Sequence, residues 1–132
     1  MILIDTSILI GYFKGLKGEP YDSLDNFLEQ NISIGICNQV YMEVLQGVKT
    51  EKEFTLLKEY LNRLNMYDLR YGKKSYESAA FMYFKCRKAG ITPRSTIDIL
   101  IAQIAIENNL LLFHNDNDFI QIAGVIPDLQ LL

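Results

Sequence analysis

Three aspartates stand directly behind short apolar segments of the sequence. Asp5 follows residues 2–4, and Asp116 and Asp118 follow residues 110–113 in the stretch HNDND. Short apolar segments of this kind are typical of buried strands, and a carboxylate at the edge of a buried segment needs a partner or solvent. Each aspartate also has an ordinary alternative role, because Asp is a good N-cap for a helix that starts there. The pattern therefore allows either helix capping or a shared chemical site.

Two further carboxylates lie in predicted helices. Glu43 is flanked by Val and Leu residues in the stretch 38–48, so it borders an apolar face. Asp98 opens the apolar stretch 97–108, and Ser95 three residues earlier gives a pattern similar to a capping box, although Glu or Gln is the usual partner. A glutamate on a helix surface is common, and capping explains Asp98, when either residue is taken alone.

The elements that position these acids alternate between strands and helices. Short apolar runs predict strands at 2–4, 32–36, 66–69 and 110–113. Helical spacing of apolar residues and helix-capping residues predict helices at 8–14, 24–29, 38–48, 51–64, 73–89 and 97–108, with Asn38 able to cap the third. The apolar face of the fifth helix is expected at Tyr76, Ala80, Tyr83 and Phe84, and the sixth helix is expected to be the most buried.

Alternating strands and helices imply parallel strands joined by right-handed crossovers. We therefore predict an α/β fold, a three-layer α/β/α sandwich around a central, mainly parallel sheet, with residues 1–132 as one domain. In such folds the ligand site lies beyond the carboxyl ends of the strands. Asp5, Asp116 and the segment leading to Glu43 all fall at those ends, and Asp98 starts a helix that enters the same edge.

Carboxylates gathered in one place repel one another. At separations of about 5 Å and an effective dielectric constant near ~20, each pair costs roughly 3 kcal/mol, which a marginally stable domain does not tolerate. Either several acids are protonated or a cation neutralises them, and all-oxygen ligation selects Mg²⁺ or Mn²⁺ over zinc. A calcium loop counted from Asp116 fails, since Gln121 and Pro127 stand where its glycine and its last glutamate belong. A Mg²⁺ site of this type indicates chemistry on phosphodiesters.

The composition fits a folded protein with no bulk attraction to nucleic acid. Apolar residues make up 49% of the 132 residues and charged residues 22%, with a net charge of −3. Basic residues form three local clusters, which a solvated helix face would also explain: Lys14 with Lys17, Lys73 with Lys74, and Lys85, Arg87 and Lys88 with Arg94. No apolar run is long enough to span a bilayer, so a cytoplasmic location is expected. Cys37 and Cys86 are expected to be buried thiols.

Three stretches of the sequence resemble one known family. LIDTSILIGYFKG at the start, NQVYMEVLQG around Glu43, and RSTIDILIAQIAIENNLLLFHNDNDFIQIA from residue 94 to 123 are similar to the PIN-domain family, specifically to VapC-type toxin endoribonucleases of VapBC toxin–antitoxin systems. Each motif is short, yet their order and spacing extend nearly from end to end of the chain. The resemblance implies a PIN-like fold, Mg²⁺- or Mn²⁺-dependent cleavage of RNA, inhibition by a cognate VapB antitoxin, and a homodimeric toxin.

The resemblance also implies roles for individual residues. The four acids of the family's catalytic and metal-binding site are matched by Asp5, Glu43, Asp98 and Asp116. Asp118 matches a further acid of some members, and Thr6 or Ser7 matches a hydroxyl that often orients a water on the metal. His114 stands where many members have threonine. It is expected to be a hydrogen-bonded edge residue, with contact to a phosphate as the alternative.

The expected reaction is hydrolysis of RNA phosphodiester bonds. Asp5, Asp98 and Asp116 would hold one or two ions, and Glu43 would bind an ion or position the attacking water. Substrate guidance by Lys14, Arg94 or the basic residues at 85–88 would complement this site.

Other classes of protein remain open from the residues alone. A signalling receiver domain also gathers acids that bind Mg²⁺ and accept phosphate, but it would carry paired acids after its first strand and a lysine after its last. A PIN-like DNA nuclease would use the same metal site. A catalytically idle binding module would use the acids only as helix caps.

Overall fold

The computed structural model describes residues 1–132, which form a five-stranded parallel sheet flanked by seven helices. The strands are β1 (Ile2–Ile4), β2 (Ile34–Cys37), β3 (Asn65–Tyr67), β4 (Leu111–Phe113) and β5 (Gln130–Leu131). They lie in the order β3-β2-β1-β4-β5, and every neighbouring pair is parallel. The predicted α/β sandwich and its four strands are confirmed, whereas the two-residue edge strand β5 was not predicted.

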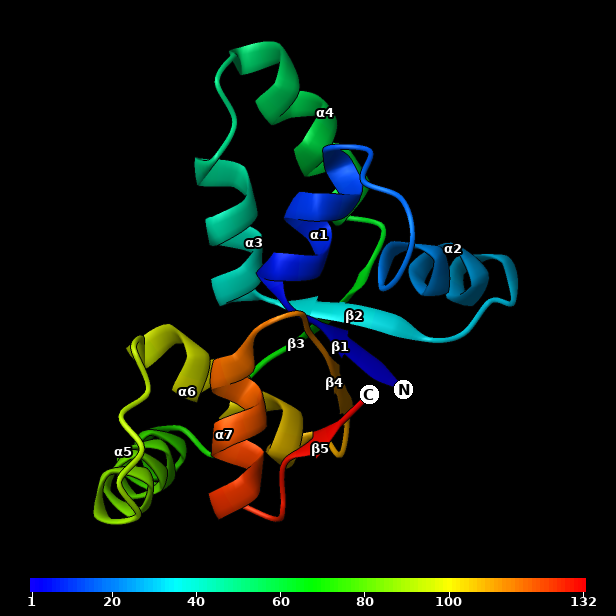
Figure 1. Ribbon diagram of the computed structural model, residues 1–132. Coiled ribbons are helices and arrows are strands. Elements are labelled where there is room, and N and C mark those ends of the chain that lie inside the picture. Colours follow the sequence, from blue (N-terminus) through cyan, green and yellow to red (C-terminus); the bar gives the residue numbers. More distant parts are fainter.

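Seven helices cover the two faces of the sheet (Figure 1). They are α1 (Thr6–Phe13), α2 (Tyr21–Glu29), α3 (Asn38–Gln46), α4 (Glu51–Leu61), α5 (Lys73–Lys88), α6 (Thr96–Glu107) and α7 (Asn117–Val125). In Figure 1, α1, α3 and α4 lie above the sheet and α5, α6 and α7 lie below it. None of these helices has the length and apolar character that a membrane-spanning segment needs.

Side-chain caps fix where several of these helices begin. Asp5 starts α1, Ser95 starts α6 and Asp116 starts α7, and each side chain accepts a hydrogen bond from a backbone N–H two residues ahead. These caps satisfy donors that the first helical turn leaves free. The predicted cap Asn38 is wrong by one position, since Cys37 is the N-cap of α3 and makes no side-chain bond there.

The core consists of 28 buried apolar residues contributed by both layers of helices and by the sheet. Helix α6 is buried on almost every side, as its composition predicts, and even Gln103 is buried within it. Both cysteines are free, buried thiols, as expected. The inner strands β1, β2 and β4 are buried because helices cover both faces of the sheet, whereas the edge strands β3 and β5 are mainly exposed.

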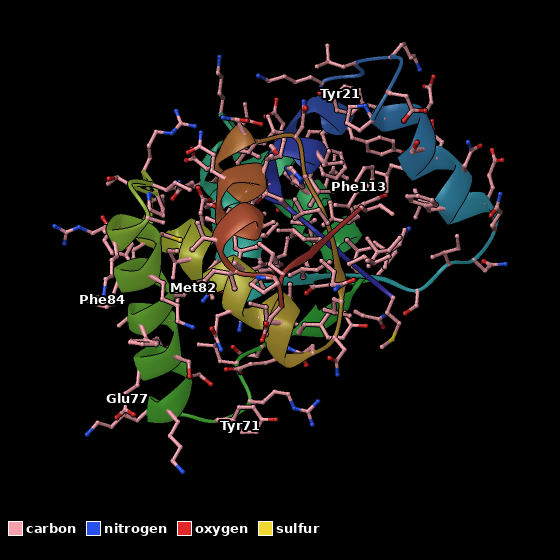
Figure 2. All side chains as sticks on the ribbon, turned by 60° about the horizontal axis from the view of Figure 1, so that its bottom comes forward. Tyr21, Tyr71, Glu77, Met82, Phe84 and Phe113 are labelled. Carbon is pink, nitrogen blue, oxygen red and sulfur yellow. The ribbon has the colours of Figure 1, made fainter.

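The predicted apolar face of α5 is wrong at three of its four residues, since only Tyr83 packs partly against the core. The helix turns Ser75, Ala79, Met82 and Cys86 toward the core, whereas Tyr76 and Phe84 are more than half exposed. Figure 2 shows Met82 on the inner side of α5, with Phe84 and Glu77 pointing outward. Small inner residues let α5 pack closely on α6, where the Ser75 hydroxyl donates to Glu107 Oε1 at 3.0 Å. Larger aromatic rings do not fit this contact.

Candidate active site

The acids singled out by the sequence come together at the carboxyl edge of the sheet. Asp5 leaves β1, and its backbone N–H donates to the Phe113 carbonyl of β4 at 2.9 Å. Asp116 begins α7 three residues after β4, and Asp98 lies in the first turn of α6. The strand β2 leads directly into α3, which carries Glu43. The parallel topology therefore brings four separate parts of the chain to one edge, as predicted.

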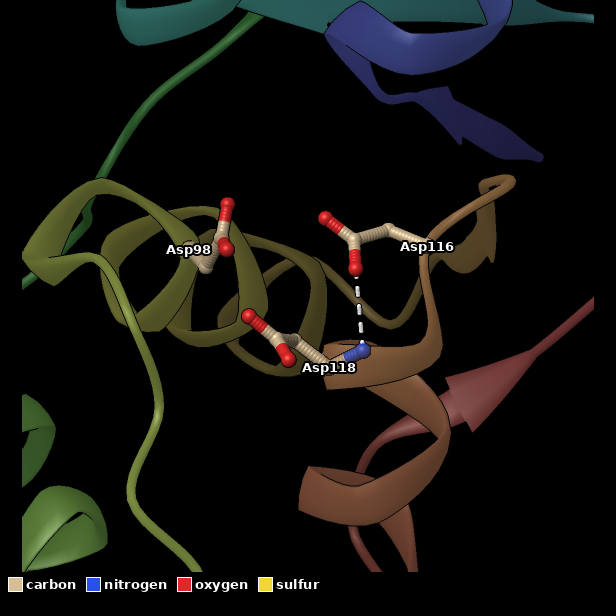
Figure 3. A group of neighbouring side chains, drawn as sticks. All are labelled: Asp98, Asp116 and Asp118. Atoms are coloured by element: carbon tan, nitrogen blue, oxygen red, sulfur yellow. Dashed lines mark hydrogen bonds between the residues drawn. The ribbon is translucent and has the colours of Figure 1, made fainter.

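Three of these carboxylates form a compact group (Figure 3). Asp98, Asp116 and Asp118 each place one oxygen within 4.8 Å of the others, and all three side chains are only partly buried. The backbone N–H of Asp118 donates to Asp116 Oδ1 at 2.9 Å, which fixes Asp116 relative to α7. The group thus offers several carboxylate oxygens to a partner that carries positive charge.

Asp5 is the most deeply buried acid, with 4% of its surface exposed. Its Oδ2 accepts a bond of 2.6 Å from the Ser7 hydroxyl and one of 3.2 Å from the Ser7 backbone N–H. The Asn115 backbone N–H in turn donates to Ser7 Oγ at 3.1 Å, which joins the ends of β1 and β4. Burial raises the pKa of Asp5, and the bonds from Ser7 oppose this rise. Ser7 is therefore a positioning residue for Asp5.

Glu43 is held toward the same edge by a contact between helices. The Thr6 hydroxyl of α1 donates to Glu43 Oε1 of α3 at 2.8 Å. This bond leaves Oε2 of Glu43 available for another partner. The two hydroxyls next to Asp5 thus have separate partners, since Ser7 binds Asp5 and Thr6 binds Glu43.

The neighbouring acids have their largest electrostatic effect at Asp98. Partial burial is the main cause that raises the pKa of Asp98 to about 7. The charges of the other four acids, Asp5, Asp116, Asp118 and Glu43, contribute to the same rise in that order. At neutral pH Asp98 is therefore partly protonated when no ion is bound. The carboxylate of Asp98 thus lies within electrostatic range of acids from three other parts of the chain.

Two of the basic residues that were predicted to guide the substrate differ in their position relative to the acids. Arg94 contacts the acids directly, with its Nε 2.9 Å from Asp118 Oδ2 and its Nη2 3.4 Å from Asp116 Oδ1. Lys14 instead ends α1 and lines a separate apolar groove, so its predicted substrate contact has no support from its position.

His114 is built into the edge of the sheet. Its Nδ1 accepts a bond of 3.1 Å from the Asp116 backbone N–H, and its ring packs edge-to-face on Phe119 at 5.4 Å between centroids. Burial lowers the pKa of His114. These contacts agree with the expected hydrogen-bonded edge residue, since a neutral imidazole that accepts at Nδ1 packs well against an aromatic ring.

The donor set fits a hard divalent cation. All five acids offer only carboxylate oxygens, and no cysteine or histidine nitrogen belongs to the group of three. Oxygen ligands of this kind suit Mg²⁺ or Mn²⁺ and disfavour zinc. A divalent charge would also offset the mutual repulsion that raises the pKa of Asp98.

Comparison with known protein families identifies the family of this chain. The family model described as PIN domain matches residues 2–125. The chain belongs to the PIN domain family. Among curated PIN-domain relatives, VapC ribonuclease Mb1587 of Mycobacterium bovis is 33% identical over 126 residues, which cover 95% of this chain and 93% of the relative. Ribonuclease VapC11 of Mycobacterium tuberculosis matches with the same identity and the same coverage. These relatives place the chain in the VapC branch of the PIN family.

Solved structures agree with this PIN fold. VapBC2 from Rickettsia felis, bound to a promoter DNA fragment, has a TM-score of 0.76 at 24% identity, with 100% of this chain and 98% of that chain covered. DNA-bound VapBC from Salmonella typhimurium has a TM-score of 0.75 at 19% identity, with 99% and 96% covered. At these identities the likeness establishes the fold. Membership of the PIN family also argues against the receiver-domain alternative.

Proposed function

We propose that this PIN-domain chain is a toxin endoribonuclease that hydrolyses RNA phosphodiester bonds with Mg²⁺ or Mn²⁺ and is neutralised by a VapB-type antitoxin. The observation that carries the proposal is the group formed by Asp98, Asp116 and Asp118, which shares its edge with Asp5 and Glu43. The curated relatives with this domain are named ribonucleases. Residues 1–132 act as one PIN domain in this proposal.

The residues of the chain have distinct roles in the proposed reaction. Asp98, Asp116 and Asp118 hold the ion, with Asp5 as a further ligand directly or through water. When bound, such an ion supplies positive charge to the phosphate and acidifies a nearby water. Glu43 positions the attacking water and accepts its proton, or adds a ligand, and Thr6 fixes its orientation through the 2.8 Å bond to Oε1.

The proposal predicts that cleavage needs a divalent ion and a ribose backbone. We expect the purified chain to cut a 5′-labelled, single-stranded RNA in Mg²⁺ or Mn²⁺, and to lose this activity completely in EDTA, because the carboxylates alone repel the phosphates. Restoring Mn²⁺ should restore cleavage. A DNA oligonucleotide of the same sequence is the control, because cleavage of RNA but not of DNA distinguishes a ribonuclease from a PIN-like DNA nuclease. Faster cleavage of the DNA, or RNA cleavage that persists in EDTA, would refute the proposal.

We further propose that the antitoxin docks in an apolar groove that is separate from the acids but shares the helices α1 and α3 with the site. This groove runs between α1, α3 and α4, and its lining residues are Ile10, Phe13, Lys14, Val44, Gly47, Val48, Glu53, Leu56, Leu57 and Tyr60. Several of its apolar side chains are open to solvent, including Leu56 at 58% and Ile10 at 39% exposure. Thr6 and Glu43 lie on the helices that form its walls.

This placement predicts that Leu56→Asp weakens the antitoxin complex. A charge in the groove should lower the affinity about 10-fold or more, because it must be desolvated without a partner. The partner to use is the product of a neighbouring toxin–antitoxin reading frame, measured by calorimetry. Ile120→Asp is the matched control, since Ile120 is 56% exposed on α7, away from the groove residues. Equal affinities for the two variants would exclude the groove.

Two further features of the proposal stay predictions. The homodimeric state is implied by the family resemblance, and sedimentation equilibrium would measure it. A cytoplasmic location follows from RNA as the substrate, and fractionation of cells would test it.

A further inference from the structure

Arg94 forms the only ion pairs within the chain. Its guanidinium reaches Asp118 Oδ2 through Nε at 2.9 Å and Asp116 Oδ1 through Nη2 at 3.4 Å. The chain contains 13 lysines and arginines, and none of the others pairs with a carboxylate. Both partners of Arg94 belong to the group of acids that fits a divalent ion. Arg94 therefore differs from the other basic residues, which form no ion pair and do not contact the acidic group.

These ion pairs are not needed for the fold. The side chain of Arg94 is 75% exposed, and exposed ion pairs contribute little to stability because water and salt screen them. Arg94 also precedes the N-cap Ser95 of α6, whose own hydroxyl accepts from the Ile97 backbone N–H at 3.1 Å. The cap is complete without the guanidinium.

Arg94 occupies oxygens that a divalent ion would need. Asp116 Oδ1 already accepts from the Asp118 backbone N–H, and Arg94 binds the same atom. A second cation brought to Asp116 and Asp118 both competes for their lone pairs and repels the guanidinium. Binding of the ion therefore weakens the hold of the acids on Arg94. The loop between α5 and α6 carries the freed side chain, and the planar fork of arginine suits two oxygens of a phosphate.

We propose that Arg94 is a positioning residue that exchanges partners: it pairs with Asp116 and Asp118 in the ion-free protein and with a phosphate of the RNA strand once the ion is bound. This inference rests on the proposed function. It makes ion binding and substrate binding cooperate, because the ion releases the arginine that the RNA needs.

The first measurement is a calorimetric titration of Mn²⁺ into the chelator-stripped chain, without RNA. Removing the competing cation in Arg94→Gln should tighten Mn²⁺ binding by about 2- to 5-fold, the range that an exposed ion pair allows. Arg94→Lys keeps the charge and should stay closer to the original affinity. Arg87→Gln is the matched control, because Arg87 is exposed on α5 and pairs with no carboxylate. It should leave Mn²⁺ binding unchanged.

The second measurement is kcat/KM for RNA at saturating Mn²⁺. Here Arg94→Gln should lower the value about 10-fold, the effect of losing one charge-assisted bond of about 1.4 kcal/mol to a phosphate. Its salt dependence should also become shallower. Tighter Mn²⁺ binding together with slower cleavage is a pair of opposite effects that misfolding does not produce. Unchanged or weaker Mn²⁺ binding in Arg94→Gln overturns the competition, and unchanged kcat/KM overturns the transfer to phosphate. If the unmodified chain cleaves no RNA, the proposed function fails while the titration result stands.

Discussion

Asp98→Asn should abolish cleavage while stabilising the ion-free protein at pH 8. The loss of activity should be about 10²–10³-fold, the scale observed when one charged or polar group at a reacting centre is removed. The gain in stability has a separate cause. Partial burial and the neighbouring carboxylates both disfavour the charged form of Asp98. An uncharged asparagine does not suffer either effect.

The sign of the stability effect follows from the pKa of Asp98. Burial first, and then Asp5, Asp116, Asp118 and Glu43, raise this pKa from 3.8 to about 7 in the folded protein. Between these two values the folded state binds a proton that the unfolded chain has released. The contribution of Asp98 to stability is therefore complete below about pH 4 and is lost as the pH rises through about 7. Since the side chain is half exposed, solvent reduces the effect to about 1–2 kcal/mol.

Thermal unfolding in EDTA at pH 5 and pH 8 measures this effect. The advantage of Asp98→Asn over the unmodified chain should be larger at pH 8 than at pH 5. Asp128→Asn serves as the control, because Asp128 is exposed and lies outside the acidic edge, so that neither stability nor cleavage should change. A variant less stable than the unmodified chain at pH 8 would show that Asp98 is not strained by its neighbours. Undiminished cleavage would remove Asp98 from the site.

Phe119→Ala should destabilise the protein by about 3–5 kcal/mol, the usual cost of a large cavity in a core. Phe119 is completely buried on the inner side of α7 and packs against the ring of His114. The same helix begins at Asp116 and carries Asp118 in its first turn. We therefore expect weaker Mn²⁺ binding as well, because the cavity loosens the helix that holds two of the proposed ligands, Asp116 and Asp118.

Denaturant unfolding of Phe119→Ala and Ile120→Ala tests this role directly. The two residues are adjacent on α7, but Ile120 is 56% exposed. Its substitution should change the free energy of unfolding by no more than about 0.5 kcal/mol. A loss below about 1 kcal/mol for Phe119→Ala, less than a well-packed core site gives, would mean that α7 repacks around the gap.

The gathering of the acids could be predicted because it depends on topology. Apolar runs followed by Asp5 and Asp116 identify inner strands and their ends, and parallel strands place those ends together. The roles of Thr6 and Ser7 could not be separated in this way. Which hydroxyl binds Asp5 and which binds Glu43 depends on side-chain orientation at the start of α1.

Helix faces were harder to predict than helix positions. The sequence predicts the bounds of α5 nearly correctly, but it misplaces most of the inner face, because large apolar residues do not always mark the buried side of a helix. In fact close packing on α6 favours small residues such as Ala79, and the aromatic ring of Phe84 remains outside. The strand β5 was missed because two residues carry no periodicity. The contacts of Arg94 were missed because loop side chains have no repeating pattern to read.

The hydrogen bond from Asn115 to Ser7 links positions 108 residues apart, and this has a consequence for how the protein is made. During synthesis Asp5 leaves the ribosome long before Asp116 has been added, so a nascent chain at first has only part of the proposed site. A copy that ends before residue 116 lacks two of the three grouped carboxylates. The proposed cleavage of RNA therefore requires that both distant segments of the chain have been made.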